Sequence, residues 1–216
     1  MFKMDQERRS LFLDYGGLLF KYDFNRETLL RAHNLALNYI NSLNSHQISP
    51  RTIWDAHTKA IQAYLSARQD NSEWTMNQIM SLFARNLGIN VDIQELEDVY
   101  KFNDHDSNPF PNTKKILMDL SKKYKLGIIS NLPHDSLITE LDKEKMLNMF
   151  DPIVISYEVG VRKPHPRIYQ QALERAKTTP ENSIFVSHDK EEVQGAENVG
   201  IRGILVKSLE EVIGFL

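Results

Sequence analysis

The amino-acid sequence predicts an α/β fold, in which helices cover both faces of a parallel sheet and an all-helical segment follows the first strand. Short runs of Ile, Leu, Val and Phe without polar alternation are typical of strands buried on both faces. Amphipathic segments separate the later runs, as expected for helical crossovers between parallel strands. By contrast, the stretch 21–107 carries only helical periodicity. The sequence therefore combines a strand–helix core with a helical insert.

The core elements follow from this patterning in chain order. Strands are predicted at 11–15, 125–130, 152–156, 183–187 and 202–206. Helices, recognised by apolar residues at helical spacing, are predicted at 113–123, 166–176 and 190–199. Pro166 suits a first helical position and Gly200 suits a C-terminal cap, so these residues mark where two of the helices begin and end.

The insert is predicted to be a cap made of amphipathic helices. These helices cover roughly 26–44, 50–68, 73–87 and 92–101. Ser49 followed by Pro50 is typical of a helix start, and the prolines of "SNPFPN" mark the return to the core. We therefore expect a core formed by residues 1–20 and 108–216, and a helical cap formed by residues 21–107.

Composition limits the classes of function. The 216 residues suit one domain with an insert, and the net charge of −3 gives no reason to expect nucleic-acid or anionic-lipid partners. The absence of cysteine excludes disulfides and thiolate chemistry. No apolar run approaches the ~20 residues that span a bilayer, and the N-terminal residues are polar. We expect a cytoplasmic protein, monomeric or homodimeric, that acts on a small molecule.

Polar side chains gather where the predicted strands end. Ligand sites in open α/β sheets lie at the carboxyl ends of the strands, so residues that follow different strands meet at one edge. The residues at these ends are Asp14, Ser130, Asn131, Lys163, Ser187, His188 and Asp189. A carboxylate, a hydroxyl, an amine and a second acidic group are therefore expected to converge there.

The order of these residues resembles the haloacid dehalogenase-like (HAD) hydrolase superfamily. The resemblance rests on Asp14 after the first strand, Ser130, Lys163 in "RKPHPRIY", and the stretch "FVSHDKEEVQGAENVGI". The insert after the first strand is similar to the subgroup with a helical cap. This resemblance covers essentially the whole chain and implies a Rossmann-like parallel sheet core with an inserted all-helical cap domain.

The resemblance also implies roles for the residues at the strand ends. Asp14 would be the nucleophile and form a covalent aspartyl intermediate that water hydrolyses. Ser130, with Asn131 beside it, would bind the substrate, and Lys163 would neutralise charge on nucleophile and substrate. Gly16 and Gly17 would let backbone N–H groups approach an anionic substrate. The implied activity is that of a phosphatase acting on a small phosphate ester.

Gly16 departs from the phosphatase pattern of the family. Phosphatases of this family usually carry a second Asp at that position, as the general acid for the leaving alcohol. Losing a general acid typically costs about 10²–10⁴-fold in rate. We therefore expect a preference for substrates with a good leaving group, which need that acid least.

Ser187 is the second departure, because it occupies the position of a metal-binding Asp in the family. Mg²⁺ prefers anionic oxygen ligands in octahedral geometry. Asp14 and the Gly16 carbonyl would still serve as ligands, and the third would be Asp189 or, as an alternative, Glu192. Mg²⁺ is therefore the expected cofactor.

Two other functions stay open. The metal-independent 2-haloacid dehalogenases of the same family lack the second Asp and carry a Ser in the last motif, as this sequence does at Ser187. A catalytically degenerate family member that acts as a binding or scaffold protein is the other alternative. His188 and Asp189 are not expected to act as a base and its orienting partner, because adjacent residues on an extended strand face opposite sides. No catalytic role is therefore expected for His188.

Overall fold

The core of the protein is a parallel five-stranded sheet, which confirms the predicted fold class. The computed structural model describes residues 8–43, 46–103 and 105–216. The strands lie in the order β5-β4-β1-β6-β7, with the first strand at the centre. They are β1 (Ser10–Leu13), β4 (Lys125–Ser130), β5 (Ile153–Ile155), β6 (Ser183–Ser187) and β7 (Arg202–Leu205).

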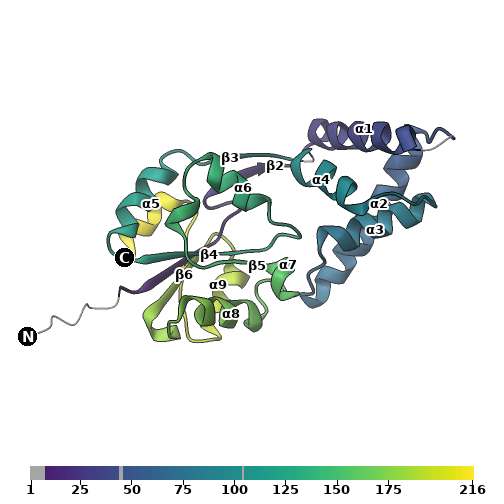
Figure 1. Cartoon of the computed structure of the whole chain (residues 1–216). Coiled ribbons are helices and arrows are strands. Elements are labelled where there is room, and N and C mark those ends of the chain that lie inside the picture. The colour runs from purple at the N-terminus through teal and green to yellow at the C-terminus, as the bar shows by residue number, and fades with distance from the viewer. Residues whose placement is uncertain (1–7, 44–45, 104) are drawn as a thin grey trace, which may run out of the picture.

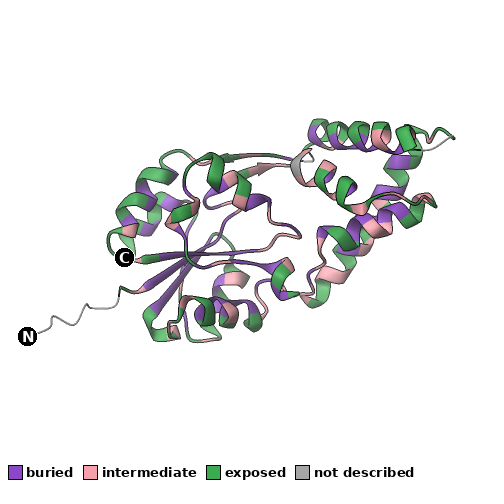
Figure 2. Ribbon diagram, in the orientation of Figure 1, coloured by how far each residue is buried: buried purple, intermediate pink, exposed green. Residues whose placement is uncertain are grey.

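Helices cover both faces of this sheet (Figure 1). Leu11 and Leu13 pack with α5 (Thr113–Ser121) and α6 (Ser136–Lys143), whereas Phe12 packs with α8 (Pro166–Ala176) on the opposite face. Alternation of side chains along the central strand explains this division. The three central strands β1, β4 and β6 are almost entirely buried (Figure 2), as their uninterrupted apolar runs predicted, whereas the edge strand β7 is partly exposed. The remaining core elements are α7 (Ser156–Val159), α9 (Lys190–Glu197), η2 (Leu147–Met149), η3 (Pro180–Asn182) and η4 (Leu209–Gly214).

The inserted helices form a separate layer beyond the carboxyl ends of the strands (Figure 1). They are α1 (Arg26–Leu43), α2 (Pro50–Ala67), η1 (Arg68–Asp70), α3 (Met76–Leu87) and α4 (Ile93–Asn103). They enclose a hydrophobic core of their own, centred on Ile40, Ile53, Phe83 and Leu96. Ser49 caps α2 through its Oγ atom, as the sequence predicted. None of the helices in the described ranges has the length and apolar character needed to cross a membrane.

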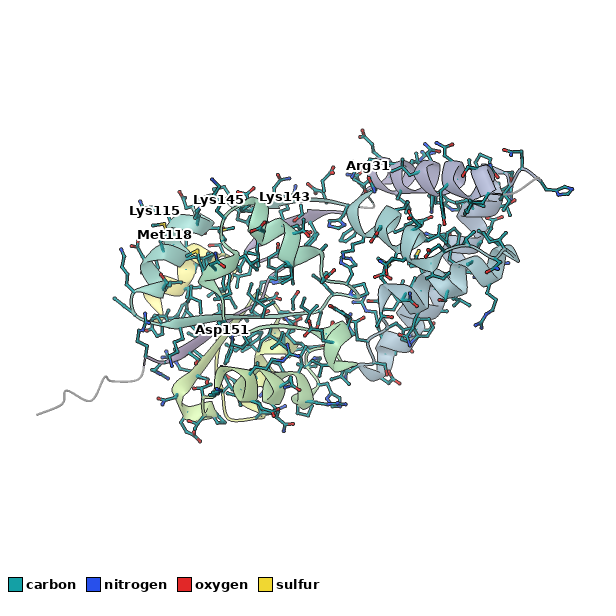
Figure 3. All side chains as sticks on the ribbon, viewed as in Figure 1. Arg31, Lys115, Met118, Lys143, Lys145 and Asp151 are labelled. Atoms are coloured by element: carbon teal, nitrogen blue, oxygen red, sulfur yellow. The ribbon has the colours of Figure 1, made fainter. Side chains whose placement is uncertain are left out.

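A two-stranded antiparallel ribbon connects core and insert, a feature that the sequence did not predict. It pairs β2 (Phe20–Asp23) with β3 (Asp106–Pro109). Both strands are short, and the polar sequence of β3 has the composition of a loop, so no strand was expected between 21 and 107. Arg31, labelled in Figure 3, donates to Asp106 Oδ1 at 2.9 Å and so ties α1 to the ribbon.

The partly buried carboxylate of Glu140, on α6, connects the ribbon to the core. Its Oε2 atom accepts hydrogen bonds from Tyr15 at 2.8 Å, Tyr22 at 3.0 Å and Ser107 at 2.7 Å. His105 lies 3.2 Å from the Oε1 atom. Burial alone would raise the pKa of Glu140, but these donors outweigh burial and lower it from 4.5 to about 2. The ionised carboxylate is therefore the form that the fold stabilises.

We predict that Glu140→Gln destabilises the fold in a pH-dependent way. A pKa lowered from 4.5 to about 2 corresponds to ~3 kcal/mol of stability at neutral pH. Because the folded-state pKa is depressed, this contribution is present above pH 4.5 and is lost as the pH falls towards 2. Urea unfolding should therefore show a large difference between variant and wild type at neutral pH that shrinks in acid.

The control for this prediction is Glu144→Gln, at the end of the same helix, where the residue is exposed and is held by hydrogen bonds of its backbone N–H and carbonyl. It should unfold like the wild type at every pH. A constant difference between Glu140→Gln and wild type across the acid range would contradict the prediction.

Candidate functional site

The strand ends and the cap enclose a cavity of ≈ 1260 Å³. Its floor contains four residues from separate segments of the core: Asp14, Ser130, Lys163 and His188. Its apolar wall comes from the cap and includes Trp54, Ile61, Leu65, Ile79 and Met80. A concave space with an apolar wall and a few convergent polar groups is the usual form of a small-molecule site.

Asp14 and Lys163 form a buried ion pair at this floor. Lys163 Nζ lies 2.5 Å from Asp14 Oδ1, and the Tyr15 backbone N–H donates to the same oxygen at 2.8 Å. The other oxygen, Oδ2, has longer contacts: His188 Nδ1 at 3.2 Å and Ser187 Oγ at 3.4 Å. Oδ2 is therefore the less tightly held oxygen of the carboxylate.

Both partners of this pair are held in their charged forms. Burial opposes ionisation of Asp14, but the charges and hydrogen bonds of Lys163 and His188 outweigh it, so the pKa of Asp14 is lowered. Burial likewise opposes the charge on Lys163, and the carboxylates of Asp14 and Glu192 reverse that effect and raise its pKa. The site thus presents a carboxylate, which is the nucleophilic form of an aspartate.

Asn131 holds the backbone of Lys163. Its Oδ1 accepts from the Lys163 N–H at 2.8 Å, and its Nδ2 donates to the Lys163 carbonyl at 3.2 Å. Nδ2 also lies 3.2 Å from Glu192 Oε1. The substrate-binding role expected for Asn131 stays a prediction; the residue lines the cavity, and its amide also holds the lysine backbone.

Glu192 is the second carboxylate of the site. Its Oε2 atom lies 2.8 Å from Lys163 Nζ and accepts from Ser187 Oγ at 2.8 Å. Burial raises its pKa, and Lys163 lowers it in part. Tyr169, a residue that sequence reasoning did not single out, donates to the Glu192 carbonyl at 2.6 Å and so fixes the start of α9.

The remaining predicted residues occupy different places. Ser130 is buried and lines the cavity, as does Gly16. Gly17 has a φ of +81°, a conformation that favours glycine, and its N–H donates to the Phe20 carbonyl at 2.8 Å. Asp189 uses its side chain to cap α9, because Oδ1 accepts from the N–H groups of Glu191 and Glu192 at 2.8 and 3.2 Å.

His188 contacts Asp14 in the site, although no catalytic role was expected for it from the sequence. The alternation rule applies within a strand, but β6 ends at Ser187 and the chain bends at His188 before α9 begins. The ring therefore turns back over the loop after β1 and contacts Asp14. Only the position of His188 directly after the strand could have indicated this outcome from sequence.

Two histidines of the cap lie in an aromatic cluster and are neutral. Burial lowers the pKa of His33 to about 4 and that of His57 to about 3. The His57 ring stacks on Tyr100 at a centroid distance of 4.5 Å and also lines the cavity. His57 therefore adds an uncharged aromatic surface to a cap wall that also contains Arg26 and Arg68.

A comparison with protein-family models assigns the chain to a family. The profile described as "Haloacid dehalogenase-like hydrolase" matches residues 39–206. The chain belongs to this family. The match confirms the family that the motif order in the sequence indicated. It includes Lys163, whereas Asp14 precedes the matched residues.

Several characterised relatives of this HAD-like hydrolase are phosphatases. A glyceraldehyde 3-phosphate phosphatase of Methanothermobacter thermautotrophicus is 44% identical over 107 residues, which cover 46% of this chain and 45% of the relative. The enzyme of that name from Pyrococcus furiosus is 31% identical over 45% of this chain and 41% of its own. The matches thus span less than half of these relatives.

Solved structures share the fold over nearly the whole chain. A 2-haloacid dehalogenase from Pseudomonas syringae has a TM-score of 0.69 at 16% identity, with 96% of this chain and 97% of that chain covered. A HAD phosphatase from Thermococcus onnurineus has a TM-score of 0.63 at 21% identity, and the match covers 96% of this chain and 97% of that chain. The HAD-hydrolase YfnB from Bacillus subtilis, whose structure is bound to magnesium, has a TM-score of 0.58 at 15% identity, with 98% and 99% covered. The same fold thus serves both chemistries.

The donor atoms around Asp14 do not suit Mg²⁺. Asp14 Oδ2 faces the imidazole of His188, Asp189 is engaged as a helix cap, and Glu192 is paired with Lys163. Residue 16 is a glycine and offers only its carbonyl. Mg²⁺ requires near-octahedral oxygen ligands, usually with one or two carboxylates free to bind it. The described ranges also contain no group of at least three His, Cys, Asp or Glu side chains arranged for a metal.

A second buried ion pair joins the cap segment to the loop that carries Lys163. Glu73, between η1 and α3, accepts from Arg162 Nη1 at 2.6 Å and from Ser156 Oγ at 2.5 Å. Tyr64 donates to its other oxygen at 2.7 Å. The backbone supports this contact, because the Glu73 N–H donates to the Gly160 carbonyl at 3.1 Å. The cap is therefore fastened to the residue next to Lys163.

We predict that Glu73→Gln destabilises the protein strongly. The Glu73 side chain is fully buried and that of Arg162 is 10% exposed, so the variant leaves a buried guanidinium without its counter-charge. Removing one partner of a buried pair typically costs about 3–5 kcal/mol. Urea unfolding measures the change directly.

Glu158→Gln provides the matched control, because it breaks the Arg175–Glu158 pair, whose side chains are 36% and 33% exposed. An exposed pair contributes only about 0–1 kcal/mol. Equal effects of the two variants would show that the Glu73 contact has no special role in the fold.

Proposed function

We propose that this HAD-like hydrolase cleaves a small phosphate monoester through a covalent phosphoaspartyl intermediate at Asp14. The observation that carries the proposal is the buried carboxylate of Asp14 at the cavity floor, with Lys163 Nζ 2.5 Å from its Oδ1 atom. The lysine keeps the nucleophile ionised and neutralises charge that the phosphoryl group brings. The 44% identity to a glyceraldehyde 3-phosphate phosphatase over part of the chain supports the choice of substrate class.

In the first step, Asp14 Oδ2 attacks phosphorus and the bond between phosphorus and the ester oxygen breaks. Oδ2 is the attacking atom because its contacts, at 3.2 and 3.4 Å, are longer than those of Oδ1. The departing oxygen takes the electron pair and then a proton from solvent, because residue 16 has no side chain that could donate one. In the second step, water attacks the phosphoaspartate, which releases phosphate and restores Asp14.

Dehalogenation of a 2-haloacid is the second candidate function. It is favoured by Ser187, which occupies the position of a metal-binding Asp, and by a donor set that does not suit Mg²⁺. In that reaction the carboxylate of Asp14 would displace halide from carbon, and water would hydrolyse the resulting ester. The floor of the cavity serves either reaction, so the two differ in the leaving group and in what the cap encloses.

We predict that Asp14→Asn abolishes turnover in either case. Wild-type protein is assayed with para-nitrophenyl phosphate for phosphate release and with 2-chloropropionate for halide release. The variant should fall to ~10⁻³ of wild type or below, because an amide is not a nucleophile. Asp119→Asn, which removes a carboxylate on the exposed face of α5, should retain wild-type rates.

The pattern of turnover distinguishes the candidates. Phosphate release alone supports the phosphatase, and halide release alone selects the dehalogenase. Turnover of neither substrate by folded protein would leave the degenerate binding or scaffold protein as the function.

We also predict that the rate depends steeply on the leaving group. Acetyl phosphate and para-nitrophenyl phosphate should be hydrolysed faster than glyceraldehyde 3-phosphate and glycerol phosphate, by about 10²–10⁴-fold, the usual contribution of a general acid. The measurement is kcat/KM plotted against the pKa of the leaving group. Equal rates across this series would mean that another group supplies the proton.

We also propose that the cap comprises residues 21–107 and that the substrate is a small-molecule phosphate. We propose further that the protein is a monomer or homodimer located in the cytoplasm. The expectation of Mg²⁺ as cofactor is the point that the donor atoms around Asp14 speak against.

A further inference from the structure

The site has a second nitrogen donor where a metal ion would otherwise be expected. His188 Nδ1 lies 3.2 Å from Asp14 Oδ2, on the opposite side of the carboxylate from Lys163, which contacts Oδ1. The His188 side chain is 44% exposed and lines the cavity. It therefore contacts the attacking oxygen and is accessible to a bound substrate at the same time.

The loop after β1 leaves room for this ring. A Cβ atom on Gly17 would lie 2.6 Å from His188 Cε1 and 2.7 Å from its Nε2. Any larger residue at position 17 would therefore displace the imidazole from Asp14. Glycine at this position serves two needs, the positive φ of the turn and the close approach of the ring.

The charges of the site are balanced without a metal. Asp14 and Glu192 supply the carboxylates, and both lie within 3 Å of the ammonium group of Lys163, at 2.5 and 2.8 Å. His188 Nδ1 lies 3.2 Å from the other oxygen of Asp14 and occupies the space beside it. A divalent ion placed among these donors would be repelled by Lys163 and would have to displace His188 from Oδ2.

We propose that His188 and Lys163 together take the place of the metal ion, so that this protein binds and turns over its phosphate substrate without a divalent cation. His188 is then a catalytic residue that donates to the attacking carboxylate and to the incoming phosphoryl oxygens. This inference rests on the proposed phosphatase function. It goes beyond that function because it assigns stabilisation of the phosphoryl charge to the side chains of His188 and Lys163.

The first test measures metal binding and metal dependence in the wild type. Isothermal titration calorimetry with Mg²⁺ should show no binding that depends on Asp14, and kcat/KM for para-nitrophenyl phosphate should be the same in EDTA and in Mg²⁺. Inorganic phosphate should bind in EDTA, by the same calorimetric method. Mg²⁺ binding that disappears in Asp14→Asn, or turnover that EDTA abolishes and Mg²⁺ restores, would overturn the inference while leaving the phosphatase intact.

The second test replaces the ring. His188→Asn should lower kcat/KM by about 10²-fold, as removal of one preorganised donor does, and should weaken the binding of inorganic phosphate in EDTA. His165→Asn is the matched control, because His165 only caps α8 through Nδ1 and asparagine is an equally good cap. Wild-type activity and phosphate affinity in His188→Asn would refute the role of this residue.

A gain-of-function variant separates a role in charge from a role in structure. His188→Asp places a carboxylate beside Asp14 and should create Mg²⁺ binding that calorimetry detects, whereas His188→Asn should not. If neither turnover nor phosphate binding is found under any condition, the proposed function itself fails and this inference fails with it. Phosphate binding that occurs only with Mg²⁺ in the wild type would instead refute the inference alone.

Discussion

The ion pair between Asp14 and Lys163 is the contact on which the site depends. Both residues are almost fully buried, at 5% and 3% exposure, and a buried charge is costly unless it is paired and hydrogen-bonded. Both charges have further partners: the Tyr15 N–H donates to the carboxylate of Asp14, and the carboxylate of Glu192 pairs with the ammonium group of Lys163. Because neither charge would persist without the other, the reactivity of Asp14 and the placement of Lys163 are one property of the fold.

This pair also explains why distant parts of the chain are fastened together. Lys163 lies on the loop between α7 and α8, and the residue before it, Arg162, is paired with Glu73 of the cap segment. The Arg162 N–H donates to the Asn71 carbonyl at 2.9 Å, and the Met76 N–H donates to the Pro133 carbonyl at 2.7 Å. A displacement of the cap would therefore pull on the loop that places the ammonium group. The position of the cap therefore affects where the ammonium group of Lys163 lies relative to Asp14.

The sequence predicted the parts of the fold that rest on local patterning. Apolar runs located the five strands of the core to within a few residues, and topology then required Asp14, Ser130 and Lys163 to meet at one edge. The β2–β3 ribbon was not predicted, because β3 is a polar four-residue strand that is formed by pairing and not by its composition. The Glu73–Arg162 pair joins residues 89 positions apart in the sequence, and a local sequence pattern cannot predict such a contact. The contact of His188 with Asp14 was not predicted, because the alternation of a strand does not apply at the bend that follows Ser187.

A site that balances its charges with side chains differs physically from one that recruits a metal. Side-chain donors are fixed by the fold: Asn131 holds the backbone of Lys163, and Gly17 leaves the space that the ring of His188 fills. Such donors need no free metal ion and are in place before the substrate binds. They can therefore stabilise charge in the transition state without a rearrangement of the site. The same arrangement limits the chemistry, because residue 16 is a glycine and has no side chain to protonate a departing oxygen. The balance of charge at Asp14 and the demand for a good leaving group therefore have a common origin in the residues that stand at positions 16, 187 and 188.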